Sequence, residues 1–475
     1  MTVGAAPLSV LKRYIENQAE VELAAHPALL GSRRSDFTSR LHPCWLGTGY
    51  GWSTCRQSDR IIFYISDVEN AAKPPSTMQL WIFYLNKFNR LLEFPGKSFF
   101  LLGPRGTGKS TWLAMNATPR LNIDLLHSEQ FYRYQARPSL LREDVAHLLP
   151  GDWIVIDEAQ RVPDLLHEVH SLYETKGLQF ALTGSSARKL KRADANMLAG
   201  RALRCDFFPL TWAEMGDDAM QDLCLDYGSL PHVVTAPKFA PDTLASYVQT
   251  YLKEEVAAEA LTRSLEPFAR FLQVAAQRHG QLLNVESVAQ EAAVKRRSVD
   301  NYFSILEDTL LGFRLPALRL GRRAKEVAHP KFYFFDAGVA RAAAGWLRET
   351  MPDAWRGFSL ETLVLNEIRA YNSYRRKDRN IYHYSVTGSL DVDFIVETAK
   401  KVMHSPAAYL AIEVKLAKKW QRSWSHALTS FCTGSEARIA KAYGIYLGAD
   451  TISDGPVEVM NLNEFSRRLW EGRIF

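Results

Sequence analysis

The feature that most constrains this chain is the segment Gly103-Pro-Arg-Gly-Thr-Gly-Lys-Ser110, which fits the pattern G-x-x-x-x-G-K-[ST]. An apolar run, SFFLL, precedes it and a helix-like run, STWLAM, follows it. In a loop between a strand and a helix, glycines let backbone N–H groups face phosphate oxygens, and the helix N-terminus adds partial positive charge. The segment therefore predicts a loop that binds the phosphates of a nucleotide.

The whole loop and the first turn of the helix are expected to contact the nucleotide. The predicted contacts are Gly103, Pro104, Arg105, Gly106, Thr107, Gly108, Lys109, Ser110 and Thr111. Lys109 would reach the terminal phosphates, and the hydroxyl of Ser110 would bind Mg²⁺. ATP and Mg²⁺ are thus the expected cofactors.

A second motif, Trp153-Ile-Val-Ile-Asp157-Glu158, is an apolar strand that ends in two acids. Such a strand would bring Asp157 to the carboxyl edge of a sheet beside the loop, where it can hold the metal through water. Glu158 could act as general base toward the attacking water, or it could be an exposed carboxylate at a strand end. Ser185 and its hydroxyl neighbours end a further strand, where they could sense the γ-phosphate or the attacking water.

Arg188 and Arg201 follow that strand closely. A fixed positive charge supplied across a subunit boundary speeds phosphoryl transfer, so either arginine could complete the site in a homo-oligomer. An ordinary surface position explains each of them almost as well.

Composition excludes several classes of protein. With 475 residues, 47% hydrophobic and 23% charged, the chain matches an ordinary multidomain globular protein rather than a disordered or fibrous one. The formal charge of +6 is mild for this length, so any nucleic-acid surface must be local. The five cysteines lack paired spacing, and no apolar run approaches the roughly 18–20 residues that span a bilayer. We expect a soluble, cytoplasmic protein with no membrane partner.

The motifs occur in an order similar to that in a large prokaryotic family of AAA+ ATPases, in which the ATPase core precedes a C-terminal domain of unknown function. The resemblance covers residues 80–475 and includes four segments near the nucleotide loop. They are Gly103–Ser110, Ile156-Asp-Glu-Ala-Gln160, Leu182-Thr-Gly-Ser-Ser186 and Leu198-Ala-Gly-Arg201. Further similar segments are Gly228-Ser-Leu-Pro231, Lys331-Phe-Tyr-Phe-Phe-Asp-Ala-Gly338, Asp391-Val-Asp-Phe394 and Ile412-Glu-Val-Lys415. Asp391 stands where the family usually has Glu, and Ser229 where it usually has a second Gly.

The pattern and the resemblance together predict an α/β protein of five parts. Residues 1–77 show no sustained helical or strand period and would be a poorly ordered or non-native extension, with a small ordered arm as the alternative. A helical pattern opens at Met78 and runs to Phe94. Residues 78–210 would form the AAA+ core with a parallel sheet and crossover helices. The remaining parts are a helical lid (211–262), a winged helix (263–345) and an α/β domain similar to restriction endonucleases (346–475).

Residues 284–307 have the spacing of a helix-turn-helix, with Ser298 predicted to cap the second helix. If this unit binds DNA, Asn301 would face a groove and three neighbouring cations, Lys295, Arg296 and Arg297, would contact phosphates. The strand-like runs that follow resemble a wing and are rich in cations: Arg314, Arg319, Arg322, Arg323, Lys325 and Lys331. The alternative is a winged helix that only packs against its neighbours.

The last part places Glu361 on a helix, Asp393 on one strand, and Glu413 and Lys415 on the next. Alternate residues of a strand share a face, so Glu413 and Lys415 would point the same way. The arrangement resembles the PD-(D/E)XK nuclease core, in which carboxylates would hold a second Mg²⁺ and the lysine would assist water attack. A nuclease fold kept only for binding is the alternative.

These inferences predict an ATP-hydrolysing protein that acts on or with DNA. The alternative is a signalling ATPase whose C-terminal domain is an inactive nuclease and binds a protein partner.

Overall fold

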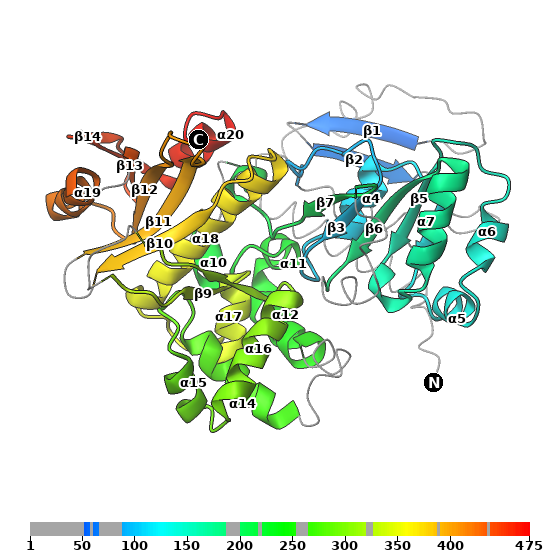
Figure 1. The fold of residues 1–475 in the computed structure, drawn as a ribbon, viewed down its shortest axis with the longest axis horizontal. Coiled ribbons are helices and arrows are strands. Elements are labelled where there is room, and N and C mark those ends of the chain that lie inside the picture. The colour runs from blue at the N-terminus through cyan, green and yellow to red at the C-terminus, as the bar shows by residue number, and fades with distance from the viewer. Residues whose placement is uncertain are drawn as a thin grey trace, which may run out of the picture. The chain divides into compact units, whose positions relative to one another are not determined.

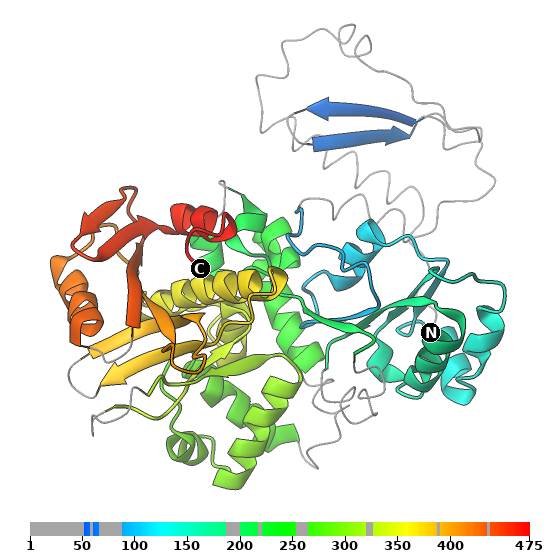
Figure 2. The same ribbon diagram turned by 45° about the horizontal axis from the view of Figure 1, so that its top comes forward.

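The computed structural model of this chain describes residues 52–57, 60–65, 88–186, 200–216, 221–252, 265–319, 326–386, 390–434 and 438–475. It divides into two compact units, residues 1–81 and 82–475. In the first unit, β1 (Trp52–Gln57) and β2 (Arg60–Ile65) pair antiparallel, with Trp52 opposite Ile65 (Figure 2). The sequence pattern left open whether this region forms a small ordered arm, and RIIFYI in β2 is a run of typical strand formers.

The second unit begins with a five-stranded parallel sheet in the order β4-β5-β6-β3-β7 (Figure 1). This confirms the predicted parallel core. Its strands are β3 (Phe99–Leu102), β4 (Leu121–Asp124), β5 (Trp153–Asp157), β6 (Gln179–Gly184) and β7 (Leu203–Asp206). Its helices are α4 (Lys109–Asn116), α5 (Ser128–Ala136), α6 (Leu140–Asp144), the short η3 (Ala159–Arg161) and α7 (Leu165–Lys176).

Both faces of this sheet are buried at its three central strands, which explains the nearly continuous apolar runs of β3, β5 and β6. In β5, Ile154 and Ile156 pack in one hydrophobic cluster, whereas Val155 between them packs in another. The chain before the sheet differs from the prediction, because residues 88–94 form no helix. The apolar residues there, such as Leu92, instead pack individually against the second cluster.

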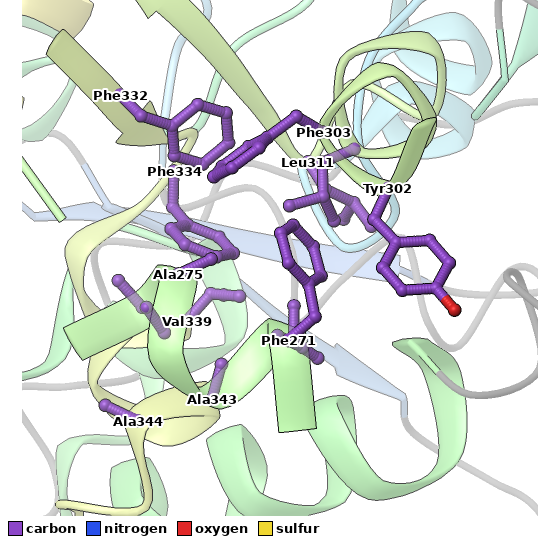
Figure 3. Packing of buried hydrophobic residues seen from close by; sticks show 14 of the residues in the cluster. Phe271, Ala275, Tyr302, Phe303, Leu311, Phe332, Phe334, Val339, Ala343 and Ala344 are labelled. Carbon is purple, nitrogen blue, oxygen red and sulfur yellow. The ribbon is translucent and has the colours of Figure 1, made fainter. Parts of the chain in front are cut away.

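A mainly helical segment follows the sheet. Its elements are α9 (Trp212–Met215), α10 (Gln221–Tyr227), α11 (Pro231–Thr235), η5 (Pro237–Phe239), α12 (Ala240–Ser246), the π-helix η6 (Tyr247–Leu252), α14 (Leu265–Gln277), α15 (Val285–Glu291), α16 (Arg296–Asp308), β8 (Gly312–Leu315), β9 (Lys331–Phe334) and α17 (Ala337–Ala344). One hydrophobic cluster joins this segment, from Leu230 to Trp355, around the rings of Phe271, Phe303 and Phe334 (Figure 3). Helices on both sides of residue 262 therefore share a single core.

In the helix-turn-helix region, the side chain of Asn284 caps α15 by accepting a hydrogen bond from the backbone N–H of Ser287 at 3.1 Å. The prediction for the next helix was wrong, because α16 begins at Arg296 and Ser298 lies inside its first turn. Lys295 is the N-cap, without a side-chain bond. β8 and β9 then pair antiparallel, and Leu282 bridges to Lys331 at the edge of this hairpin.

Asp336 holds two of the segments that carried the family resemblance together. Its buried carboxylate caps α17 through the N–H of Val339 at 3.0 Å and accepts from the N–H of Ser229 at 2.7 Å. A Cβ on Gly338 would lie 2.0 Å from the carbonyl oxygen of Tyr227, so only glycine fits this approach. These residues therefore have a structural role in joining α10 to α17.

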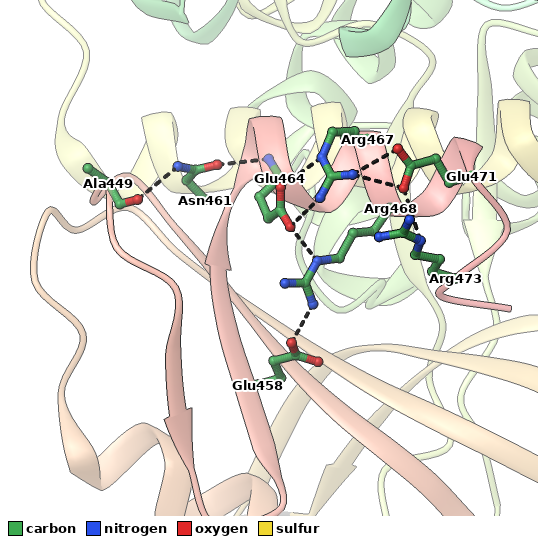
Figure 4. A network of polar contacts seen from close by, with 8 residues as sticks. All are labelled: Ala449, Glu458, Asn461, Glu464, Arg467, Arg468, Glu471 and Arg473. Carbon is green, nitrogen blue, oxygen red and sulfur yellow. Dashed lines mark hydrogen bonds and ion pairs between the residues drawn. The ribbon is translucent and has the colours of Figure 1, made fainter.

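The last part is a six-stranded mixed sheet in the order β10-β11-β12-β13-β15-β14. Its elements are α18 (Asp353–Tyr374), β10 (Ile381–Val386), β11 (Leu390–Ala399), β12 (Ala408–Lys415), α19 (Arg422–Gly434), β13 (Arg438–Tyr446), β14 (Ile452–Asp454), β15 (Val457–Asn461) and α20 (Leu462–Trp470). Residues of α18 and α20 share one hydrophobic cluster with the sheet, and residues of α19 share another. A half-buried network centred on Glu464 connects α20 through Arg468 to Glu458 of β15 (Figure 4).

The loop of the β8–β9 hairpin lies along β10, the edge strand of this sheet. The N–H of Leu318 donates to the carbonyl of His383 at 2.8 Å, and the N–H of Val327 donates to that of Ser385 at 3.0 Å. The hairpin thereby covers backbone groups that an edge strand would otherwise leave unpaired. The helical segment and the C-terminal sheet are thus joined by strand-like pairing as well as by side chains.

His279 joins β9 to α18. It is fully buried, its Nδ1 accepts from the N–H of Phe334 at 3.1 Å, and its Nε2 bonds to the hydroxyl of Thr362 at 2.8 Å. Because Nδ1 is an acceptor, the ring is neutral and Nε2 carries the proton. Burial lowers the pKa of His279 to about 3.

We predict that this histidine makes the fold sensitive to acid. The unfolded chain binds the proton with a pKa near 6.5, so stability is full above that pH and falls toward pH 3, by up to about 1.4 kcal/mol per pH unit. Denaturant unfolding at pH 7.5, 6 and 5 should show a smaller pH dependence in His279→Gln than in the natural chain. Parallel stability curves for the two proteins would contradict this role.

Candidate functional site

The predicted nucleotide loop connects β3 to α4, and its geometry requires glycine at three places. Gly106 and Gly108 have φ of 77° and 92°, in the left-handed region that favours glycine. At Gly103, a Cβ would lie 2.3 Å from the carbonyl oxygen of Phe207. The loop is therefore shaped by backbone conformations that residues with side chains would strain.

Lys109 lies inside this loop, where only 5% of its surface is exposed. Its Nζ donates to the carbonyls of Gly103 at 2.7 Å and Pro104 at 3.0 Å, and Thr107 also bonds Pro104 at 2.8 Å. Ser110, next in α4, is exposed. The ammonium group is thus enclosed by the loop that would surround the phosphates.

The two acids lie at the end of β5, beside β6. The hydroxyl of Thr183 in β6 donates to the carboxylate of Asp157 and accepts from the N–H of Glu158 at 2.9 Å. Glu158 has φ of 56°, which is unusual for a residue with a side chain and typical of strained positions at functional sites. One hydroxyl therefore sets the positions of both acids.

The carboxylate of Glu158 is held on one side by two polar neighbours. The hydroxyl of Ser185 donates to its Oε2 at 3.1 Å, and the amide of Gln160 donates to the same oxygen. That amide also lies 3.0 Å from the Ser185 hydroxyl, and its Oε1 is buried without a partner. Gln160 ends the motif Ile156-Asp-Glu-Ala-Gln160, which by itself assigns it no role, and its position two residues after Glu158 is the signal in the sequence.

Of the two arginines proposed to act across a subunit boundary, the structure describes Arg201. Arg201 pairs with Glu174 of α7, and 37% of its side-chain surface is exposed. Arg188 lies outside the described residues. Within this chain Arg201 therefore already has a carboxylate partner.

Arg90 was missed by the sequence analysis, yet it contacts the nucleotide loop directly. It donates to the carbonyl of Thr107 at 2.7 Å and to that of Phe208 at 2.7 Å, and its Nε lies 3.0 Å from Glu214. Its guanidinium also reaches the hydroxyl of Tyr374 in α18 at 3.4 Å. A single buried cation thus connects the loop to the C-terminal part of the chain.

The acids and lysine predicted in the last domain do come together. Asp393 of β11 accepts from the N–H of Val414 at 2.9 Å, and Lys415 pairs with Glu413 on the same strand. Glu361 of α18 accepts from the hydroxyl of Tyr333 at 2.6 Å. Lys415 and Glu361 also interact electrostatically with Asp393.

Lys331 belongs to this cluster rather than to a basic wing, which corrects its predicted role. Its Nζ lies 3.4 Å from Asp393 and 3.7 Å from Asp391, with 6% of its side chain exposed. Side chains of a strand alternate between its faces, so Lys331 lies with Tyr333 on the face of β9 toward the C-terminal sheet, while Phe332 and Phe334 pack in the helical core. Its buried ammonium group is therefore unavailable to contact a phosphate backbone. No local pattern distinguished it from the neighbouring surface cations.

Burial governs the protonation of the cluster. It raises the pKa of Glu361 and of Glu413 to about 8 each, and the negative charge of Asp393 acts in the same direction. For Lys331, burial opposes the charged form, but the surrounding carboxylates outweigh it and raise its pKa. Among the residues that the structure describes, no three His, Cys, Asp or Glu side chains are arranged to hold a metal ion.

The predicted DNA-contacting residues are only partly accessible. Lys295, Arg296, Arg297, Asn301 and Arg319 are exposed. Arg314 pairs with Glu307 at 3.2 Å. Arg322, Arg323 and Lys325 lie outside the described residues. Three of these four exposed cations therefore lie at the start of α16, and Arg319 follows β8.

Three family models match successive parts of the chain. Residues 96–216 match an AAA domain, which indicates a P-loop ATPase of AAA type. Residues 221–350 and 356–465 match two domains of unknown function, DUF8612 and DUF4143. Within the described part of the chain, no helix is long and apolar enough to cross a membrane.

The similar curated proteins are themselves uncharacterized. One from Mycobacterium tuberculosis and one from Mycobacterium bovis are each 29% identical over 280 residues, which is 56% of this chain and 61% of each relative. One from Haemophilus influenzae is 23% identical over 359 residues, 68% of this chain and 86% of that protein. The chain therefore spans less than two thirds of the mycobacterial relatives that it matches.

The buried pair of Arg90 and Glu214 leads to a stability prediction. Replacing Arg90 by Met would leave the fully buried Glu214 carboxylate without its cation, which should cost about 3–5 kcal/mol. Arg375→Met, which removes the exposed pair of Arg375 with Glu93, should cost less than about 1 kcal/mol. Thermal unfolding of the two variants checks this; equal destabilisation would contradict it.

Proposed function

We propose that this chain binds and hydrolyses ATP with Mg²⁺ at the loop between β3 and α4. The observation that supports this most strongly is that β3, β5 and β6 end at one edge of the sheet. Lys109 follows β3, whereas Asp157 and Glu158 end β5 and are bonded to Thr183 of β6. The residues proposed as phosphate-binding lysine, metal-binding acid and general base thus all follow or end strands that finish at the same edge of the sheet.

The residues at this edge fit nucleotide and Mg²⁺ chemically. A serine hydroxyl and a carboxylate, from Ser110 and Asp157, are the hard oxygen donors that Mg²⁺ prefers. When bound, Mg²⁺ would neutralise the charge that develops on the transferred phosphoryl group. Lys109 would exchange its bonds to Gly103 and Pro104 for bonds to the terminal phosphates.

Glu158 is the proposed general base. It would take a proton from the attacking water, while Ser185 and Gln160 keep its carboxylate in one orientation. Arg188 or Arg201 would complete the site from a neighbouring copy, and Arg201 would first have to leave Glu174.

Removing the lysine charge should abolish the activity. We expect Lys109→Ala to lower the rate of phosphate release from Mg·ATP by at least about 100-fold, because the lysine would stabilise charge formed in the transition state. Lys238→Ala, which removes an exposed lysine on η5, is the matched control and should retain the rate. Turnover that survives in Lys109→Ala would disprove the site.

We further propose that ATP turnover acts on or with DNA, and that residues 263–345 are used as a winged helix. The supporting observation is the exposed row Lys295, Arg296 and Arg297 at the start of α16, one turn before the exposed Asn301. Phosphate contacts from such cations would position α16 for base contacts. A signalling ATPase that binds a protein partner is the alternative.

Double-stranded DNA should therefore stimulate ATP turnover at low salt and lose this effect at high salt. The triple change of Lys295, Arg296 and Arg297 to Ala should reduce the stimulation several-fold. The same charge change at Arg375, Arg376 and Lys377 should have little effect. A rate indifferent to DNA would favour the protein-partner alternative, and equal losses in both triple variants would indicate contact by general charge only.

The C-terminal domain is proposed to be nuclease-like. In support, Glu361 lies on the helix before the sheet, Asp393 on β11, and Glu413 and Lys415 on β12, as in the PD-(D/E)XK arrangement. The same fold could serve binding without cleavage, and this alternative is compatible with the internal pairing of its charges.

A further inference from the structure

The carboxylates of Asp391 and Asp393 pair with the ammonium group of Lys331 where β9 meets the C-terminal sheet, and two further acids lie near enough to act on it electrostatically. The charge of Lys331 is affected by Glu361, Asp391, Asp393 and Glu413 together, which come from α18, β11 and β12. We name the four acidic residues the carboxylate cluster. In this arrangement the acids pair with the ammonium groups of Lys331 and Lys415, and among the described residues no three of them are placed to hold a metal ion.

One oxygen of the cluster has no partner. Glu413 is 7% exposed, and its Oε2 accepts no hydrogen bond although it is buried, while its other oxygen pairs with Lys415. An unpartnered buried carboxylate oxygen is costly, and in native proteins it calls for an explanation such as an ion. This observation is independent of the number of acids present.

Lys331 is held loosely for a buried cation. Its Nζ lies 3.4 Å from Asp393 and 3.7 Å from Asp391, whereas bonds between charged groups are usually about 2.7–2.9 Å. A compact ammonium with three donors and a flexible stem is a point charge rather than a precise ligand. It therefore provides charge at this position without satisfying each oxygen.

We propose that the carboxylate cluster is a divalent-cation site of the C-terminal domain that Lys331, contributed by the preceding hairpin, closes by occupying the position of the cation. The inference rests on the proposed nuclease-like domain for the chemistry of the site, but its closure follows from the contacts of Lys331. Asp393, Glu413 and Glu361 supply the carboxylate oxygens that Mg²⁺ or Mn²⁺ prefers.

The position of Lys331 depends on the contact between the β8–β9 hairpin and β10. Lys331 begins β9, and the other end of the same hairpin loop pairs with β10 through Ala317 and Glu326. Withdrawing the hairpin from β10 would therefore withdraw the ammonium from the cluster. The site would open only when the helical segment and the C-terminal sheet move relative to each other.

The proposal is tested by titrating the full chain with Mn²⁺ in the absence of nucleotide and measuring the heat of binding by calorimetry. Lys109→Ala is the common background, so that the ATP site does not contribute. We expect the chain that keeps Lys331 to bind no Mn²⁺ at the cluster, and Lys331→Met to bind it there. The affinity of Lys331→Met for Mn²⁺ should be at least about 10-fold higher than that of the chain that keeps Lys331. Adding Glu413→Gln to Lys331→Met should remove the gained site, and Mn²⁺ should raise the unfolding temperature of Lys331→Met only.

Three further variants serve as controls. Lys331→Arg keeps the charge and should behave like the natural chain. Lys400→Met removes an exposed lysine that pairs with Asp378, and it should gain no Mn²⁺ site. Lys331→Gln keeps a donor toward Asp393 without the charge and replaces Lys331→Met if that variant does not fold.

The outcomes separate this inference from the proposed functions. Mn²⁺ binding by the chain with Lys331 as tight as that of Lys331→Met would overturn the closure and leave the nuclease-like site intact. Folded Lys331→Met and Lys331→Gln that gain no binding would overturn the cation site as well. ATP turnover of chains that retain Lys109 is measured separately and decides the ATPase proposal alone.

Discussion

The parallel pairing of β3, β5 and β6 is the constraint on which the nucleotide site depends. The register places Leu102 opposite Gly184 and Ile156 opposite Leu182, so the three strands end at one edge. Leu102 and Gly184, which are 82 positions apart in the sequence, are thereby brought together, and the hydroxyl of Thr183 bonds both acids that follow Ile156. A change of register in any of these strands would separate the loop from its acids.

Beyond the sheet, the segments of the second unit are held by buried polar groups whose partners come from distant parts of the sequence. Arg90 joins the loop to Glu214 and Tyr374, and Glu367 of α18 accepts from the N–H groups at the start of α9 and from Trp470. Buried charges add little net stability, but an unpaired one is costly. Such groups therefore favour one arrangement of the segments over others, and they add less to its free energy of unfolding.

Features set by a few neighbouring residues could be predicted from the sequence, whereas features set by long-range packing could not. The P-loop, the strand ending in Asp157 and the E-x-K strand were all predicted, because each is a short pattern with its own backbone requirement. Residues 88–94 were predicted to be helical because their apolar residues have helical spacing, yet they pack against the sheet without forming a helix. Ser298 was assigned as a cap from residue type alone, whereas α16 starts two residues earlier.

What the sequence determined by itself is the chemistry available at each strand end: a lysine and glycines after β3, two acids after β5, and acids with a lysine on β11 and β12. Only the tertiary structure decided which charges face one another. Arg90 and Lys331 look like ordinary surface cations in the sequence, but long-range packing buries both, and each then requires anionic partners. The physical reason is that the cost of burying a charge depends on neighbours that the chain supplies from far away, which no local pattern records.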